Sequence, residues 1–209
     1  MPIAKLSTSS RRSQADRRES SERVLIEALL AIVAEEGVSA ATFEAIGKRA
    51  GCSRGLVSQR FGSKEGLTRA AIDYVHTVRD EELESVDVEK KSGCNGLLTY
   101  VRTHFDAYAQ AQEGRAYFTL LAHAVADLSD IRLLFAKSHE RAERHIMRYI
   151  KKGQQDGSVR ADIDAKSGAL MVGSLLMGAS IQAIIDQKIN LPKVRDATLK
   201  TLKLSFAAT

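Results

Sequence analysis

Four residues in the segment 54–61 have side chains that could contact nucleic acid bases. On a helix that begins at Arg54, the residues Arg54, Gly55, Ser58 and Gln59 fall at positions i, i+1, i+4 and i+5 and share one face. Small residues near its start would let this face enter the major groove of DNA, and the Gln59 amide can pair bidentately with adenine. The simpler alternative is the solvated face of a small helical core.

Two helices joined by a tight turn must position that face. Thr42 can N-cap a first helix, 42–50, and Ser53 a second, 54–61, since a hydroxyl oxygen can accept an unpaired N–H of the first turn. Gly51, between them, suits the left-handed conformation that ends a helix. Apolar residues at helical spacing form the opposite, inward faces, namely Phe43, Ile46, Ala50, Leu56, Val57 and Phe61. The pattern predicts a helix-turn-helix motif.

This stretch resembles the DNA-binding signature of the TetR family of transcriptional regulators. The matching positions are Thr42, Ile46, Ala50, Gly51, Ser53, Gly55, Val57, Phe61, Lys64, Glu65 and Leu67. The departures are Gly47, Cys52, Ser58 and Arg60, where the family usually has Ala, Val, Tyr, and His or Tyr. The resemblance implies an all-α chain with an N-terminal three-helix helix-turn-helix DNA-binding domain. It also implies a C-terminal helical ligand-binding and dimerisation domain, and a repressor that a small-molecule effector releases from DNA.

The expected DNA contacts form two groups. Arg54, Gly55, Ser58 and Gln59 are expected to face bases or adjacent phosphates. Thr42, Ser53, Arg60 and Lys64 are expected to anchor the DNA backbone. Lys64 lies in the first turn of the next helix, where the free N–H groups and the helix dipole also favour phosphate. The family's usual Tyr touches the DNA backbone, and Ser58 in its place can make only a shorter contact.

Charge is concentrated at the amino end of the chain. The 209 residues carry a formal net charge of +5, and five cations oppose one anion both in residues 1–18 and in residues 42–64. Residues 1–15, rich in Ser, Thr and Arg, predict a disordered basic arm. That arm could reach into the minor groove or along phosphates, or could be an ordinary mobile terminus. A basic excess permits a polyanionic partner without proving one.

Helical periodicity continues to the end of the chain. We expect a DNA-binding domain at 16–79, with the motif at about 42–61, and an effector-binding and dimerisation domain at 80–209. The expected helices are 16–36, 42–50, 54–61, 63–86, 96–113, 115–126, 129–155, 164–185 and a last one ending near 206, with Gly114 breaking the chain between the fifth and the sixth. Helix 63–86 is long enough to link DNA to the second domain mechanically.

The last two helices are the expected dimer interface. The segment Ala169–Ile185 is apolar on nearly all sides, so it must be buried on all sides. The family resemblance implies a four-helix bundle with the partner's copies, and Gly173, Ser174 and Gly178 would permit close approach. Such a homodimer would prefer a palindromic operator.

The middle helices carry polar side chains that interrupt apolar faces. A low-polarity cavity for an unknown effector could use Tyr100, His104, Phe105, Tyr108, Tyr117, Phe118, Leu121, His123 and Met171. For any single residue, a core position with its polar tip at the surface explains the pattern as well.

Other functions find little support in the sequence. No catalytic or nucleotide-binding motif is present, so we expect no enzyme and no cofactor. His139, Glu143 and His145 could share a metal, but the charge-rich segment favours a solvated face. Cys52 could be redox-sensitive beside Arg54, although a small buried side chain is the simpler interpretation.

The sequence also predicts where the protein works. No signal peptide is visible, and Ala169–Ile185 falls short of the ~20 residues that span a bilayer, so we expect a cytoplasmic protein with no membrane partner. The alternatives are a non-specific DNA-binding protein, a ligand-binding module without DNA binding, and a small-molecule enzyme.

Overall fold

The structure is a computed structural model that describes residues 14–109 and 111–208, without the side chains of residues 14–17, 107 and 108. The described chain is all-α, and its amino-terminal helices form a helix-turn-helix domain, as the sequence predicts. The predicted basic arm, residues 1–15, lies almost wholly outside the described residues.

The amino-terminal part, which we call the head, precedes a helical body. The head comprises α1 (Gln14–Glu36), the short 3-10 helix η1 (Val38–Ala40), α2 (Phe43–Arg49), α3 (Arg54–Phe61) and the start of α4 (Lys64–Ser85). The body comprises η2 (Val88–Lys90), α5 (Gly93–Thr103), the π-helix η3 (His104–Tyr108), α6 (Gln112–Ala126), α7 (Arg132–Gln155), α8 (Ala165–Ile185) and α9 (Leu191–Phe206).

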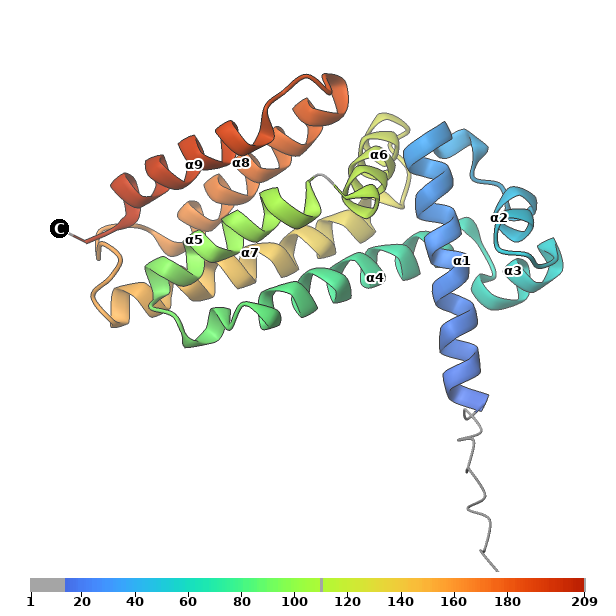
Figure 1. The fold of residues 1–209 in the computed structure, drawn as a ribbon, viewed down its shortest axis with the longest axis horizontal. Coiled ribbons are helices and arrows are strands. Elements are labelled where there is room, and N and C mark those ends of the chain that lie inside the picture. Colours follow the sequence, from blue (N-terminus) through green and yellow to red (C-terminus); the bar gives the residue numbers. More distant parts are fainter. Residues whose placement is uncertain (1–13, 110, 209) are drawn as a thin grey trace, which may run out of the picture.

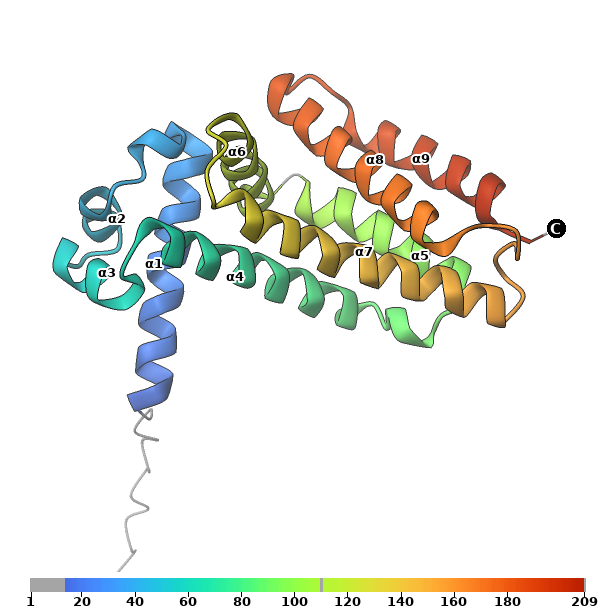
Figure 2. The ribbon, with the colours of Figure 1, turned by 180° about the vertical axis from the view of Figure 1, so that it is seen from behind.

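The head stands at one end of the molecule (Figure 1). Helices α2 and α3 lie on one side of α1, and α6 lies on its other side, between α1 and the rest of the body. Helix α4 leaves the head and runs along the body beside α7, as both views show (Figure 2). Helices α8 and α9 form the edge opposite α4, and the chain ends far from the head.

Helix α1 is buried on two sides. Residues from Leu25 to Val33 are buried with the exception of the half-buried Glu27. Helices α2 and α4 cover one side of α1, and α6 covers another. Val24, just before this stretch, is 45% exposed.

Two hydrophobic cores meet inside the molecule. The first joins the head to α6 and to the start of α7, with Ile46 and Val57 packed in the same cluster as Tyr117 and Phe135. The second joins α5, the rest of α7, α8 and α9. Helix α6 therefore packs with the head at least as much as with the body.

The middle of the chain departs from the predicted helices. Gly114 does not break a helix: it lies inside α6, which begins at Gln112. The expected helix 96–113 instead ends its α-helical part at Thr103 and continues as the π-helix η3, closed by the bond from Ala109 N–H to His104 C=O at 2.7 Å. Single π turns inside helices often occur at functional sites.

Helix α8 is the least covered apolar helix in the described part of the chain. It has 21 residues, so the length argument made from the segment 169–185 does not hold. By length and mean hydropathy, 1.8, it passes the test for a membrane span, and only 28% of that window is buried. The exposed apolar side chains on α8 and α9 include Leu170, Met171, Met177, Ile185 and Leu204.

Candidate nucleic-acid interface and ligand cavity

Three hydroxyl caps set the geometry of the helix-turn-helix. Thr42 Oγ1 accepts the Ala45 N–H at 3.1 Å, and Ser53 Oγ accepts the Leu56 N–H at 3.2 Å. Ser63 caps α4 in the same way. The two caps predicted from the sequence, Thr42 and Ser53, are confirmed.

Helix α3 projects its polar face from the head. Val57 is fully buried, while Arg54, Gly55, Ser58 and Gln59 are all exposed. The structure thus places these four predicted residues together on an unobstructed helical surface. Phe61, predicted as an inward residue, is only partly buried.

The predicted backbone anchors have different surroundings. Thr42, Ser53 and Lys64 are exposed. Because the capping oxygens of Thr42 and Ser53 accept a hydrogen bond, their O–H groups can still donate to a phosphate. Arg60 is less accessible, because its side chain is 22% exposed and its Nη1 lies 3.4 Å from Glu22 Oε1 on α1.

Some of the cationic side chains in residues 42–64 are in ion pairs and others are not. Arg49 pairs with Glu35 at 2.7 Å, and Arg60 pairs with Glu22. Lys48, Arg54 and Lys64 form no ion pair with any described residue and are exposed. Their charge is therefore available to a polyanion.

Two departures from the family signature have a local explanation. A Cβ atom at Gly47 would lie 2.9 Å from the Cys52 carbonyl oxygen, so α2 and the turn approach too closely for the usual Ala without a shift. Cys52 is partly buried against the first core. It occupies the position of a small apolar side chain.

A cavity of about 130 Å³ lies between α4, α5, α6, α7 and α8. Its lining consists of His76, Arg79, Tyr100, His104, Tyr117, Phe118, Ser138, His139, Ala142, Glu143, Ile146, Ala169, Leu170, Gly173, Ser174, Leu176 and Met177. Because Tyr117 and Phe118 belong to the first core and Tyr100 and Ile146 to the second, a ligand here would contact both cores.

Four of the nine predicted effector residues line this cavity: Tyr100, His104, Tyr117 and Phe118. The structure does not place the others in its lining. Phe105 is buried in the second core and Leu121 in the first. Met171 is 49% exposed. His123 is exposed and lines a separate hollow of about 400 Å³ near Lys64. The Tyr108 side chain lies outside the described part of the chain.

A chain of buried polar groups crosses one wall of the cavity. Arg79 Nη2 donates to His76 Nδ1 at 2.6 Å, so the neutral ring carries its proton on Nε2 and donates to Ser138 Oγ, also at 2.6 Å. Tyr117 Oη lies 2.6 Å from the same Ser138 oxygen. Burial and the Arg79 charge lower the pKa of His76 to about 3, and burial raises the pKa of Tyr117 to about 12. Arg79 and His76 were not predicted from the sequence, because only the course of α4 brings them to this wall.

His104 is a second buried polar group in the lining of the cavity. Ser180 Oγ donates to the Leu176 carbonyl at 2.9 Å and accepts from His104 Nε2, also at 2.9 Å. Burial, together with the Arg79 charge, lowers the pKa of His104 to about 3. The ring is therefore neutral at physiological pH.

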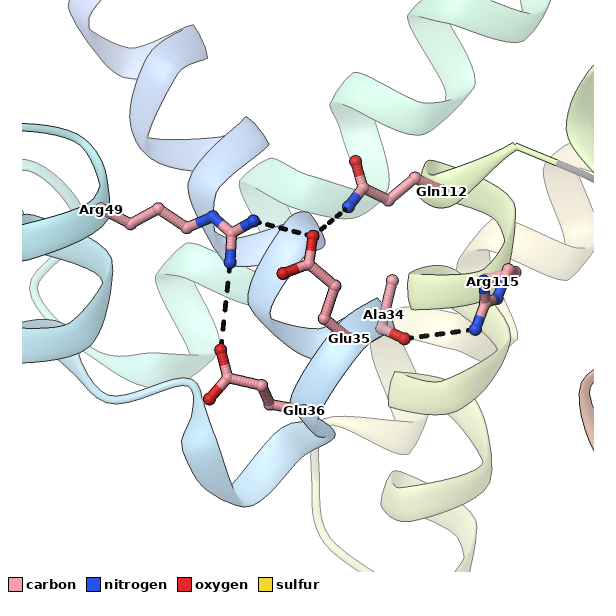
Figure 3. Close-up of polar contacts among 6 residues, drawn as sticks. All are labelled: Ala34, Glu35, Glu36, Arg49, Gln112 and Arg115. Atoms are coloured by element: carbon pink, nitrogen blue, oxygen red, sulfur yellow. Dashed lines mark hydrogen bonds and ion pairs between the residues drawn. The ribbon is translucent and has the colours of Figure 1, made fainter.

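Side chains of α6 meet the head at its junction with the body (Figure 3). Gln112 Nε2 donates to Glu35 Oε1 at 3.0 Å, and Arg49 donates to the same oxygen. Arg115 Nη2 donates to the Ala34 carbonyl at 3.4 Å. Helix α6 thus contacts both the cavity and the base of the helix-turn-helix.

The possible metal ligands do not converge. No group of three or more His, Cys, Asp or Glu side chains within the described residues is placed to hold a metal ion. His139 and Glu143 line the cavity, whereas His145 stacks on Tyr100, with ring centroids 6.4 Å apart.

Comparisons with known proteins point to one family. Residues 25–71 match the sequence model described as "Bacterial regulatory proteins, tetR family". No curated protein matches the chain. Solved structures share the fold. One is a protein from Rhodococcus sp. assigned to the TetR-family transcriptional regulators, with TM-score 0.79 and 19% identity over 88% of this chain and 98% of that one.

Two further structures extend this likeness. A TetR transcriptional regulator from Chloroflexus aurantiacus J-10-FL has TM-score 0.76 and 17% identity over 92% of this chain and 99% of that one. The transcriptional regulator FadR from Bacillus subtilis, in complex with stearoyl-CoA, has TM-score 0.70 and 18% identity over 86% and 96%. With a helix-turn-helix domain that matches the tetR family model at residues 25–71, and with the fold of these regulators along nearly its whole length, the chain is similar to the TetR family of bacterial DNA-binding transcriptional regulators.

Proposed function

We propose that this protein is a sequence-specific, homodimeric repressor that a small-molecule effector releases from its operator. The observation that carries the proposal is the exposed face of α3, where Arg54, Ser58 and Gln59 stand out from a helix fixed by Val57 and by the Ser53 cap. A regulator that acts on genomic DNA in a bacterium works in the cytoplasm, which is where we place it.

The proposed DNA contacts are of two kinds, to bases and to phosphates. Gln59 has an amide that can read adenine, and Arg54 can reach a base or a phosphate. The exposed hydroxyls of Thr42 and Ser53 and the ammonium of Lys64 suit phosphate oxygens, which fix register without reading sequence. Because Arg60 pairs with Glu22, we assign it to the docking of α3 on α1 as well as to a phosphate.

The dimer interface is proposed on α8 and α9. Their exposed apolar side chains need a cover, and a Cβ atom added at Gly173 or Gly178 would meet nothing within 4 Å, so a partner helix could approach there. A twofold dimer would present two α3 helices about 34–36 Å apart, or a multiple of that spacing, to a palindromic operator.

The effector site is proposed in the cavity between the two cores. The FadR structure similar to this chain contains stearoyl-CoA, which supports a ligand-responsive body in a protein of this fold. A ligand that binds the DNA-incompetent arrangement more tightly shifts the population away from DNA. In the family such release is expected to use the position of the head relative to the body.

Selection of preferred duplexes from a random pool tests DNA binding, palindromy and spacing together. We expect a palindromic site, bound with steep salt dependence, and a dimer by light scattering. A purified protein that ignores every duplex at low ionic strength would contradict the proposal. Equal affinity for all duplexes would move the protein to the non-specific class.

A charge placed among the exposed apolar side chains of α8, away from the cavity, tests the interface separately. Met171 is 49% exposed and does not line the cavity, and Met171→Glu should yield monomers, because a carboxylate would be desolvated against the partner. Its matched control is Lys137→Glu on the exposed face of α7, which should leave the dimer intact. Unchanged dimers of the Met171 variant would remove α8 from the proposed interface.

A further inference from the structure

The ligand cavity is small, which limits the effector to the size of one ring. Its volume is about 130 Å³. An apolar cavity of about 150 Å³ holds benzene, whereas drug-sized ligands occupy roughly 300–1,000 Å³. The cavity therefore suits a monocyclic ligand and not a long acyl chain.

Aromatic side chains form several of its walls. The rings of Tyr117 and Phe118 meet edge to face with centroids 5.2 Å apart, and those of His104 and Phe118 do so at 6.3 Å. Aromatic pairs prefer such arrangements because the positive ring edge meets the negative face of its neighbour. A flat aromatic ligand can continue this packing.

The charge in the wall favours an anion. Arg79 is 7% exposed, and its guanidinium carbon lies 5.6 Å from the centre of the Tyr100 ring. Its charge contributes to the lowered pKa of His76, His104 and His139, so its field reaches α4, η3 and α7. A carboxylate placed in this field gains a charge-assisted interaction at low dielectric.

One carboxylate opposes this field. Glu143 lines the cavity from α7 and is half-buried. A cationic ligand would use Glu143 together with the Tyr100 ring, so the charge of the ligand can be decided by experiment. Arg79 is the more buried of the two charges, and a buried guanidinium gains more from an added counter-charge than a group near solvent does.

We propose that this cavity binds a small monocyclic aromatic carboxylate, of the size and charge of benzoate, with its carboxylate directed to the Arg79 side. The inference rests on the proposed function only in that a small-molecule effector occupies this cavity.

Calorimetry with three isosteres provides the test: benzoate, benzamide and benzamidine, which carry negative, zero and positive charge at about pH 7.5. We expect benzoate to bind about tenfold more tightly than benzamide, and benzamidine to bind most weakly, because hydrogen bonds to a charged group are the stronger ones. Equal or tighter binding of benzamidine, or no binding of any of the three at millimolar concentration, would overturn the proposal.

Substitutions at Glu143 and Arg79 test which charged side chain acts on the ligand. Glu143→Gln should tighten benzoate binding about twofold to fivefold without improving benzamidine, while Glu140→Gln, on the exposed face of the same helix, should change neither. Arg79→Met should reduce the preference for benzoate over benzamide to less than about threefold, and Arg79→Lys should retain more of it. If Arg79→Met does not fold, the isostere order and the Glu143 variant still decide the question.

Failure of the inference is distinguishable from failure of the proposed function. If the protein selects a palindromic duplex but does not prefer benzoate, the ligand class is wrong and the regulator remains. If benzoate ranks first but no duplex is bound, the ligand class stands without a DNA-binding function.

Discussion

Gln112 of α6 and Glu35 of α1 are joined by a hydrogen bond of 3.0 Å, which crosses the junction between body and head (Figure 3). The same Glu35 oxygen accepts from Arg49, in the last turn of α2, at 2.7 Å. Helix α6 also supplies Tyr117 and Phe118 to the cavity. One carboxylate therefore connects the helix that lines the cavity to the helix-turn-helix, and this contact is additional to α4.

Glu35→Ala tests this connection. The variant loses both hydrogen bonds, so movement of α6 should be passed less completely to α2. We expect ligand-free DNA affinity to change little and the effect of an effector on that affinity to shrink by about twofold to fivefold. Fluorescence anisotropy with and without effector measures the DNA affinity and the effector response.

The control is Asp162→Ala, which removes the exposed Arg160–Asp162 ion pair in the α7–α8 loop. An unchanged effector response in Glu35→Ala would contradict this role of Glu35.

Lys64→Ala should weaken binding to all duplexes alike. Lys64 is exposed at the first position of α4 and forms no ion pair with a described residue, so its charge can displace one counterion from DNA. The salt slope of log K should flatten by about one ion. Lys166, which is also exposed and lies in the first turn of α8, provides the matched control Lys166→Ala. If the two variants have the same slope, Lys64 is not a phosphate contact.

Gln59→Ala should act on the preferred duplex only. The amide is exposed on α3 and can pair with adenine at two atoms, so its loss should cost roughly 1–3 kcal/mol on the selected site. Affinity for a random duplex should remain within about twofold. A loss of similar size on both duplexes would show that Gln59 contacts the backbone.

The head could be predicted from sequence because its signals are local. Thr42, Ser53 and Ser63 cap helices through bonds to residues three positions later, and Gly51 and Gly62 have φ of 71° and 70°. Such signals need no knowledge of the rest of the chain. The helix-turn-helix was therefore predicted with nearly its observed boundaries.

The cavity could be predicted only in part because it depends on packing between distant segments. Tyr100 and Tyr117 interrupt apolar faces and were identified on that ground. Arg79 and His76 were not among the predicted residues, because only the packing of α4 against α5, α6 and α7 buries them. Gly114 was misread because a glycine inside a helix and one at its end look the same in a sequence.

Core stability in the head should follow burial and not side-chain size. Ile46 is fully buried, so Ile46→Ala should cost about 2–5 kcal/mol of unfolding free energy. Phe61 is only partly buried, so Phe61→Ala should cost less than the roughly 3–5 kcal/mol typical of a buried Phe, contrary to a ranking by volume. Urea unfolding measures both variants. A larger loss for Phe61→Ala would mean that α3 packs more deeply than described.

Acid should destabilise the protein through its buried histidines. His76 and His104 have pKa values of about 3 in the folded chain, against about 6.5 when unfolded. Between these pH values the unfolded state binds more protons than the native state does. The free energy of unfolding that the neutral histidines contribute above pH 6.5 is therefore lost as the pH falls towards 3. Each histidine should contribute a slope of about 1.4 kcal/mol per pH unit to the free energy of unfolding well below pH 6.5.

The variant His104→Gln, whose amide can still donate to Ser180, should remove one such slope between about pH 4 and 5.5. Urea unfolding across this range measures the difference. Above about pH 7.5 both chains should show the same pH dependence, since both histidines are then neutral in either state. Parallel curves at acid pH would mean that His104 is protonated in the folded protein.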